Sequence, residues 1–515
     1  MNSGRVWQAG LMTAVIASAG LYGPAAVAQS APSNEQLSNL VRQQARQIEQ
    51  LNARIDAMEN GGQGQSSTAT GSNMNQNTAS GGAPRQGQPS LPAGEASQRA
   101  TDRYANGGQG QDLEQRVSDL ESDKVKVDWS DGAPEFSSPD GDYTFGIGGR
   151  IQYDQSGTFG SRYDGDGDEG DRNIVGSEFR RLRLDAHGQI AGALLYKLEL
   201  DFANDSVGLR DAYIAAAKDF QLGKGIVYLG SKFSDRGLDG RTSSKWIWFN
   251  ERNTVANGIS PASGAYATGV TGEFYGEDNW HASLAVTKGS NTGDNDSSNN
   301  LTVLSRAHVN PIATDNFILH LGANGFYEDF ENDRTPDDYG NSVTIGGHFN
   351  DNLRIVSDVM NPSSSTAYGF ELAGLAGPFA AGAEYGHRTL DGRGGAGDAD
   401  IDAYSGQIGY ALTGEMFGYS TKQGVWSRPK IANPVTEGGI GDWELVARYE
   451  AIDYENNATY SGGTGHGASV GLNWYLNKYA RALLNYTRWQ TNNRTGDFGL
   501  PDDGNSINAR AQIVF

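Results

Sequence analysis

The chain has 515 residues, a formal net charge of −22 and no cysteine. The lack of cysteine excludes a disulfide framework and thiolate chemistry. The strong negative charge argues against nucleic acid as a partner, because nucleic acids bind basic surfaces. No run of about 18 apolar residues follows the amino-terminal segment, so the sequence offers no transmembrane helix.

Residues 1–28 have the organisation of a secretory signal peptide. Arg5 gives a weakly positive start, residues 11–21 are mostly apolar, and Ala26-Val27-Ala28 forms an A-x-A cleavage site. We therefore predict that the protein is exported and that the mature chain starts near Gln29.

Residues 29–60 carry a short coiled-coil pattern, with apolar side chains at heptad spacing. The predicted seam residues are Leu37, Val41, Ile48, Leu51, Ile55 and Met58. A lone amphipathic helix is the alternative. Residues 61–111 are rich in Gly, Ser, Gln and Asn and predict a disordered linker. Residues 112–126 repeat the heptad rhythm as a second short helix, and we expect the whole extension to lie in the periplasm and to help hold subunits together.

The end of the chain, residues 505–515, alternates between apolar and polar side chains. The apolar set is Ile507, Ala509, Ala511, Ile513 and Phe515, and the polar set is Ser506, Asn508, Arg510 and Gln512. Because a strand shows successive side chains to opposite faces, this segment has an apolar and a polar face. Its length suits a tilted transmembrane strand of about 9–11 residues. An edge strand of a soluble β-sandwich is the alternative.

Similar alternation recurs from residue 142 to the carboxy terminus and defines eighteen candidate strands. They start near Tyr143, Phe179, Leu194, Val207, Ile226, Thr268, Trp280, Leu301, Phe317, Ser342, Leu353, Tyr368, Phe379, Asp402, Trp443, Ala468, Ala480 and Asn505. Short connections such as 189–193 alternate with long polar ones such as 155–176, as periplasmic turns and extracellular loops of outer-membrane barrels do. We predict an all-β protein, with a transmembrane antiparallel β-barrel of 16–18 strands over residues 142–515 in the bacterial outer membrane.

Several of these segments resemble, in residues and in order, the phosphate-selective porin O/P family. They are FGIGGRIQYD (145–154), EFRRLR (178–183), YKLELDFA (196–203), DAYI (211–214), WELVARY (443–449) and VGLNWYLN (470–477). The resemblance implies a passive channel rather than an enzyme, with sixteen strands in each subunit of a homotrimer. It also implies inorganic phosphate or other small anions as solutes, and we expect no cofactor.

In that family, basic residues on the pore wall and on an infolded third loop attract anions. The candidate pathway residues here are Arg150, Arg180, Arg181, Arg183, Arg210, Lys232, Arg236, Arg241, Ser243, Ser244 and Lys245. Residues 234–265 would form the third loop. Guanidinium groups suit the task because their fork of donors matches phosphate oxygens and stays charged. Alternatively, some arginines pair across strands with Asp185, Glu199, Asp201 or Asp211 and only stiffen the wall.

Other candidate sites and functions are weaker. Asp164, Asp166 and Asp168 have the alternation of a calcium loop but lack its glycine and glutamate. This acidic segment would instead contact outer-membrane lipid and lipopolysaccharide through divalent cations. The seven histidines show no metal-binding spacing. The competing functions are a channel for other polar solutes, a barrel that anchors the extension to the cell wall, and a barrel enzyme, for which no catalytic spacing is present.

Overall fold

The computed structural model describes residues 124–165, 171–277, 279–290, 301–330, 342–357, 362–394, 397–456 and 460–515. The predicted signal peptide, coiled coil and linker lie outside the described residues, as does the predicted second helix up to residue 123. The end of that predicted helix is wrong, because Lys126 begins strand β1. None of the described helices is long and apolar enough to cross a membrane.

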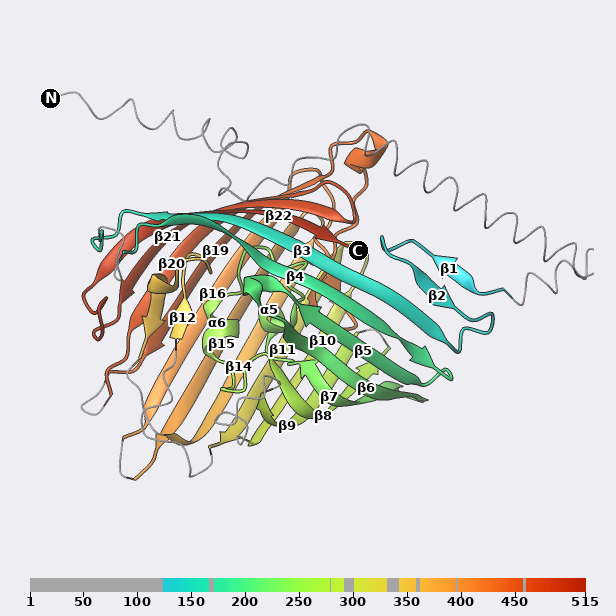
Figure 1. Ribbon diagram of the computed structural model, residues 1–515, viewed down its shortest axis with the longest axis horizontal. Coiled ribbons are helices and arrows are strands. Elements are labelled where there is room, and N and C mark those ends of the chain that lie inside the picture. The colour runs from blue at the N-terminus through green and yellow to red at the C-terminus, as the bar shows by residue number, and fades with distance from the viewer. Residues whose placement is uncertain are drawn as a thin grey trace, which may run out of the picture. The chain divides into compact units, whose positions relative to one another are not determined.

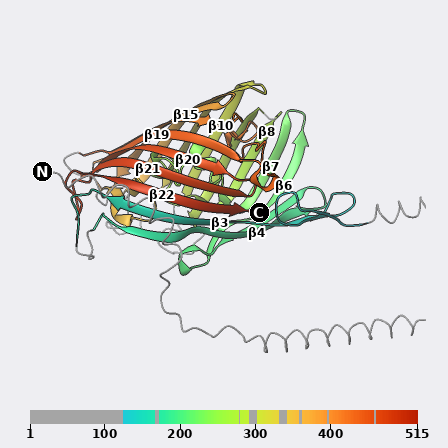
Figure 2. The ribbon, with the colours of Figure 1, turned by 90° about the horizontal axis from the view of Figure 1, so that it is seen from above.

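The described part of the chain forms a closed barrel of sixteen antiparallel strands (Figures 1 and 2). They are β3 (Thr144–Phe159), β4 (Val175–Ile190), β5 (Leu194–Asp201), β6 (Gly208–Phe220), β7 (Gly223–Phe233), β8 (Tyr266–Gly276), β9 (Trp280–Ser290), β10 (Leu301–Ala313), β11 (Phe317–Asp329), β14 (Pro362–Ala376), β15 (Phe379–Gly392), β16 (Ala399–Ala411), β19 (Asp442–Tyr454), β20 (Thr464–Tyr475), β21 (Ala480–Asn492) and β22 (Asp502–Val514). Strand β22 pairs with β3 and closes the ring.

Two of the eighteen predicted strands are not part of the wall, so the sequence count was too high. The segments near Ser342 and Leu353 form β12 (Ser342–Thr344), the 3-10 helix η3 (Asp351–Leu353) and β13 (Arg354–Val356). Strands β12 and β13 pair only with each other, as a separate two-stranded sheet. Three residues are too few to cross a bilayer. Their apolar residues, such as Val343 and Ile355, are buried in a cluster with wall residues such as Ile452.

The closing strand confirms the predicted alternation. Ile507 and Ile513 are 42% and 52% exposed on the outer surface, whereas Ser506 and Arg510 are 0% and 3% exposed on the inner surface. Val514, which breaks the alternation in chemistry, also lies on the inner side and is buried. The barrel therefore has an apolar outside and a polar inside, as a lipid-embedded barrel requires.

The two ends of the barrel differ, as the connection lengths predict. Most connections at one end, here called the turn end, are short, such as 191–193 between β4 and β5. The exception is the connection 412–441, which contains β17 (Tyr419–Ser420), β18 (Val425–Trp426) and the 3-10 helix η4 (Val435–Glu437). We call it the turn-end segment. The sequence pattern did not predict it.

The barrel interior is partly filled by infolded chain. The connection 234–265, here the inner loop, contains α5 (Leu238–Arg241) and α6 (Thr254–Gly258), which lie within the outline of the barrel in Figure 1. The inner loop crosses the lumen: Gln152 of β3 donates to the Ser244 carbonyl at 2.9 Å, and the Leu238 amide donates to Glu384 of β15 at 2.8 Å. The prediction that this loop folds into the barrel is confirmed by these contacts.

Two smaller features complete the described chain. A hairpin of β1 (Lys126–Asp128) and β2 (Glu135–Ser137) adds to the start of β3, with Phe136 opposite Phe145. The 3-10 helix η2 (Ala203–Asp205) connects β5 to β6. The hairpin is at the turn end, where Ser130 accepts hydrogen bonds from Lys478 and Tyr479 of the β20–β21 turn.

Candidate anion pathway

Two cavities of about 740 Å³ and 780 Å³ lie inside the barrel. We call the first the arginine vestibule and the second the turn-end cavity, because residues of the β1–β2 hairpin line it. The cavities meet at six residues that line both, here called the neck: Arg150, Lys197, Glu199, Ser243, Trp246 and Ser427.

The two cavities differ in charge. Eight basic residues line the arginine vestibule: Arg150, Arg180, Arg181, Arg183, Lys197, Arg210, Arg241 and Arg252. Its acidic lining residues are Glu199 and Asp211. The turn-end cavity is instead mixed, with the basic residues Arg150, Lys197, Lys245 and Arg428 and the acidic residues Asp128, Asp131, Glu135, Asp185 and Glu199. A solute passing through therefore meets a strongly positive compartment and then a nearly balanced one.

A β-bulge explains how two consecutive arginines both face the lumen. Regular alternation would send either Arg180 or Arg181 to the lipid side. The register between β3 and β4 shifts here: Tyr153 lies opposite Phe179, and Gln152 lies opposite Arg181, so Arg180 is the extra residue. Both arginines consequently line the vestibule, while Phe179 on their amino-terminal side is 52% exposed on the outside.

The paired arginines hold the inner loop in place. Arg180 donates to both carboxylate oxygens of Glu251, at 2.7 Å and 3.0 Å, and Arg181 lies 3.6 Å from the same carboxylate. Arg510 of the closing strand adds a contact of 3.3 Å to Glu251. Burial alone would raise the pKa of Glu251, but the three guanidinium groups outweigh it and hold that pKa well below its usual range. One loop carboxylate thus fixes three strand arginines.

A second irregularity in strand pairing brings charged residues to another part of the vestibule. Between β5 and β6 the register changes so that Glu199 faces both Arg210 and Asp211, and all three line the vestibule. Arg183 donates to Glu199 and to Asp201, at 2.8 Å each. Cross-strand pairing and pore lining, which the sequence left as alternatives, therefore occur together: Arg183 is paired and still lines the cavity.

Arg150 connects the wall to the inner loop at the neck. Its guanidinium donates to Ser244 Oγ at 2.7 Å and to Ser243 Oγ at 3.4 Å, and forms an ion pair with Glu199 at 3.3 Å. Lys245 follows on the loop and lines the turn-end cavity. Burial, reinforced by the positive charge of Arg150, lowers the pKa of Lys245 to about 8. Lys245 has no carboxylate partner among the described residues.

The structure brings most of the predicted pathway residues to the two cavities, but not all. Nine reach them: Arg150, Arg180, Arg181, Arg183, Arg210, Arg241, Ser243, Ser244 and Lys245. Lys232 is instead buried in an ion pair with Glu273, and Arg236 donates to the Ala256 carbonyl at 2.8 Å within the inner loop. Sequence reasoning missed Lys197 as a neck residue, although its place in the polar row of β5 could have indicated it.

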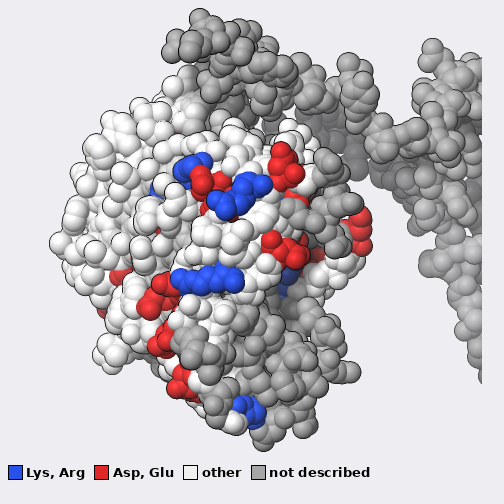
Figure 3. Space-filling model, turned by 90° about the vertical axis from the view of Figure 1, so that its left-hand side faces the viewer, with Lys and Arg blue, Asp and Glu red and all other residues white. Residues whose placement is uncertain are grey.

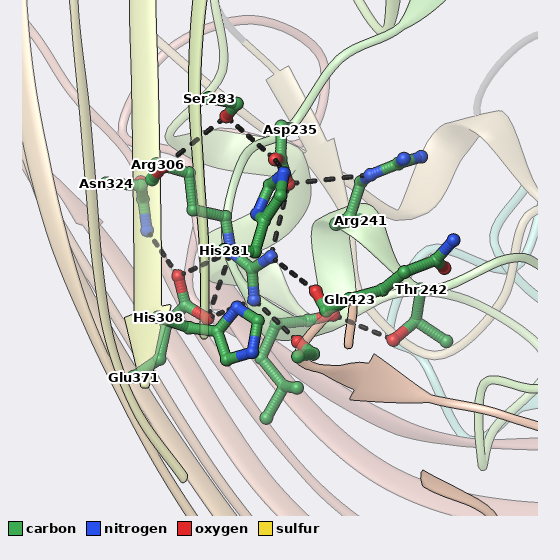
Figure 4. A network of polar contacts seen from close by, with 12 residues as sticks. Asp235, Arg241, Thr242, His281, Ser283, Arg306, His308, Asn324, Glu371 and Gln423 are labelled. Carbon is green, nitrogen blue, oxygen red and sulfur yellow. Dashed lines mark hydrogen bonds and ion pairs between the residues drawn. The ribbon is translucent and has the colours of Figure 1, made fainter. Parts of the chain in front are cut away.

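The wall formed by β9, β10, β11 and β14 also carries buried charges, which form a network of polar contacts (Figure 4). We call it the sealed wall, because the turn-end segment covers its arginine, Arg306. Arg306 donates to Glu371 at 2.7 Å and to the carbonyl oxygens of Gln423 and Gly424 in the turn-end segment. Its side chain is 0% exposed. His308 contacts the same segment, with Nε2 2.8 Å from the Thr421 carbonyl.

One cluster in this region has the residue types of a metal site. Asp235, Glu273 and His281 bring a potential ligand atom each within 4.8 Å of one another. However, Lys232 pairs with Glu273, and Arg241 and Arg306 lie 3.5 Å and 3.2 Å from Asp235. A cation would have to compete with these positive charges, so we assign no metal here. The predicted calcium candidate is not tested, because Asp166 and Asp168 lie outside the described residues.

The outer surface has no comparable positive compartment on the described part of the face in Figure 3, where basic and acidic side chains lie beside one another among uncharged residues. On this face, therefore, the described basic residues do not gather as they do in the arginine vestibule. A lumen wall of guanidinium groups attracts anions and replaces part of their hydration shell, which is how charged rings select ions in channels.

The barrel residues of this chain are similar to known proteins. Residues 145–515 match the family model described as phosphate-selective porin O and P. The chain is 27% identical over 419 residues to Porin O of Pseudomonas aeruginosa, which covers 75% of this chain and 91% of the relative. It is 26% identical over 373 residues to an uncharacterized protein of Caulobacter vibrioides, which covers 70% of this chain and 71% of that one.

Similar solved structures include OmpT, an outer membrane protein of Vibrio cholerae, with 13% identity, 72% and 98% of the two chains covered and a TM-score of 0.46. An anion-selective porin from Comamonas acidovorans has 12% identity, 72% and 100% of the chains covered and a TM-score of 0.44.

Proposed function

This chain belongs to the phosphate-selective porin O and P family, and from that premise we propose that it conducts small anions, with a preference for phosphate, through the arginine vestibule and the neck. As a porin it is an outer-membrane β-barrel channel and not an enzyme. The observation that carries the proposal is the charge of the vestibule, where eight basic residues line the cavity together with two acidic ones.

Phosphate is supported by the arrangement of donors. Guanidinium forks match the spacing of phosphate oxygens, and the vestibule presents Arg180 and Arg181 side by side. The hydroxyls of Ser243 at the neck and of Ser244 in the vestibule lie within hydrogen-bond distance of Arg150, so they are positioned to replace water around an anion. Charge–charge pairing inside the wall reduces the net field but leaves the cavity positive.

The first test is the reversal potential of the purified protein in a planar bilayer under a chloride gradient, repeated with added phosphate. We expect an anion preference, with phosphate blocking the chloride current. Replacing Arg180 and Arg181 by Gln should lower the anion-to-cation permeability ratio by about tenfold, which corresponds to about 1.4 kcal/mol. A cation-leaning wild-type channel would contradict the proposal.

The matched control is Arg488→Gln. Arg488 is an arginine on the outer surface, paired with Asp503, and its side chain is 45% exposed. Since it does not line either cavity, its removal should leave the permeability ratio unchanged.

A general channel for polar solutes is the second candidate. It is favoured by the turn-end cavity, whose acidic and basic residues nearly balance. In that case phosphate would not block the chloride current, and uncharged solutes of similar size would permeate at rates comparable to chloride.

We also propose that the turn end and the amino-terminal extension face the periplasm, that the protein is a homotrimer, and that the acidic loop around Asp164 contacts lipopolysaccharide. The family resemblance supports the trimer, and short periplasmic turns support the orientation. Deletion of residues 29–125 tests the extension: a channel should keep conducting, whereas loss of activity in a barrel that still folds would favour the anchor.

A further inference from the structure

The neck contains a single aromatic residue, Trp246, for which anion conduction alone gives no role. Trp246 lies on the inner loop, lines both cavities and is partly exposed. Its amide donates to the Ser243 carbonyl at 2.8 Å, so the same turn positions the indole and the serine hydroxyl. The indole therefore lies where the two cavities meet.

The other aromatic rings of the vestibule are already engaged. Phe233 and Tyr266 pair across β7 and β8, with ring centroids 5.1 Å apart. The Arg252 guanidinium lies over Phe233 at 5.1 Å, and the Arg183 guanidinium lies over Tyr266 at 5.8 Å. Trp246, in contrast, has neither a ring partner nor a cation over its face among the described residues. The part of the indole that lines the cavities can therefore contact a solute.

A partly exposed indole suits a solute with C–H or planar groups rather than bare phosphate. Bare phosphate is recognised by hydrogen-bond donors and positive charge, and an indole offers only one N–H. Aromatic faces instead favour flat or ring-shaped organic groups. Nucleotides, which combine phosphate with a ring, stack on aromatic side chains in this way whatever their base. The neck combines this face with Arg150, Lys197 and the hydroxyls of Ser243 and Ser427.

We propose that the neck selects phosphate monoesters that carry a ring-shaped organic group, such as a sugar phosphate. The phosphate group binds Arg150 and Lys197, and the ring lies against Trp246. The inference rests on the proposed anion function and deepens it by naming the solute class. Cavities of about 740 Å³ and 780 Å³ on either side of the neck have the size of sites that hold organic ligands, about 300–1,000 Å³.

The test measures block of the chloride current by two probes, glucose 6-phosphate and inorganic phosphate, in wild type and in Trp246→Ala. We expect glucose 6-phosphate to block wild type at a lower concentration than phosphate. In Trp246→Ala the ratio of the two half-blocking concentrations should change by about tenfold in favour of phosphate. Trp246→Phe, which keeps a ring, should retain most of the preference.

The control is Trp443→Ala. Trp443 lies on the outer side of β19 and stacks on Trp474, with ring centroids 4.9 Å apart. Its replacement should leave both half-blocking concentrations unchanged. An unchanged ratio in Trp246→Ala, or a wild type that is blocked equally by both probes, would overturn this inference while phosphate block still supports the anion channel. A wild type that is cation-selective and blocked by neither probe would overturn the proposed function itself.

Discussion

Two walls of the same barrel carry buried arginines, and only one of them lines an open passage. On the vestibule wall, the Arg183 side chain is paired with Glu199 and Asp201 and keeps 9% of its surface exposed to the cavity. On the sealed wall, Arg306 is paired with Glu371 and is 0% exposed. On both walls the arginine points inward from a strand and forms ion pairs with carboxylates.

The difference lies in the infolded chain that covers each wall. The turn-end segment places the carbonyl oxygens of Gln423 and Gly424 on Arg306, so its remaining donors are used by the protein. The inner loop contacts the vestibule wall mainly through Glu251 and the serines near Arg150, and a cavity remains beside them. An inward-facing arginine therefore lines the passage where the infolded chain leaves a cavity beside it, and is closed off where that chain covers it.

The largest expected effect follows from breaking a pair on the sealed wall. Glu371→Gln would leave Arg306 without its bidentate partner in a fully buried site, and we expect the free energy of unfolding to fall by about 3–5 kcal/mol. Urea titration of the protein refolded into lipid vesicles measures this change. Ion selectivity of the remaining folded channels should be that of wild type.

Asp211→Asn provides the comparison on the vestibule wall. Asp211 pairs with Lys197 at 2.9 Å, and its side chain is 14% exposed to the cavity. Water in the cavity can solvate Lys197 after it loses Asp211. We therefore expect the free energy of unfolding to fall by about 1 kcal/mol or less and the anion selectivity to increase. Equal destabilisation by the two substitutions would contradict the distinction between a sealed and an open wall.

An intermediate effect is expected from pH. Because the pKa of Lys245 is lowered to about 8, this cation is charged at pH 7 and mostly neutral at pH 9. Anion conductance should therefore fall by up to about twofold as the pH rises between these values. In Lys245→Gln the fall should disappear, and in Lys245→Arg conductance should stay high at pH 9. A rise of conductance with pH would contradict this assignment.

The smallest effect is expected at the turn-end mouth. Asp128, Asp131 and Glu135 are exposed residues of the β1–β2 hairpin that line the turn-end cavity. Neutralising all three should raise the anion-to-cation permeability ratio by less than about twofold at 0.1 M salt, because the Debye length is then about 10 Å. At 1 M salt, where it is about 3 Å, the variant and wild type should be indistinguishable in bilayer recordings.

Much of the barrel could be predicted from the sequence, because most of the wall follows one simple rule of alternation. From Ser506 to Ile513 of β22 the polar residues face inward and the apolar ones outward, and this period of two is visible without any structure. The alternation rule predicts wall strands wrongly where short segments outside the wall alternate by chance. The segments around Val343 and Ile355 alternate, yet they are too short to cross the bilayer and pack inside the barrel.

The site was harder to predict, because it depends on exceptions to alternation. Nothing in the pair Arg180-Arg181 shows that a bulge turns both inward, since the shift depends on how β4 pairs with β3. The burial of Lys232 against Glu273 likewise depends on the neighbouring strand β8. The inward fold of residues 412–441 has no periodic signal, because irregular backbone is positioned by the walls that it meets.

The pairing of the last residue has a consequence for the order of assembly. The Gly149 amide donates to the Phe515 carbonyl at 2.7 Å, and β22 pairs along β3 from Asn505 to Val514. The first and last wall strands are thus the most distant partners in the chain, and contacts of such long sequence separation form late and slowly. The ring cannot close until β22 has been synthesised and exported, and a chain without β22 would keep two open strand edges prone to aggregation.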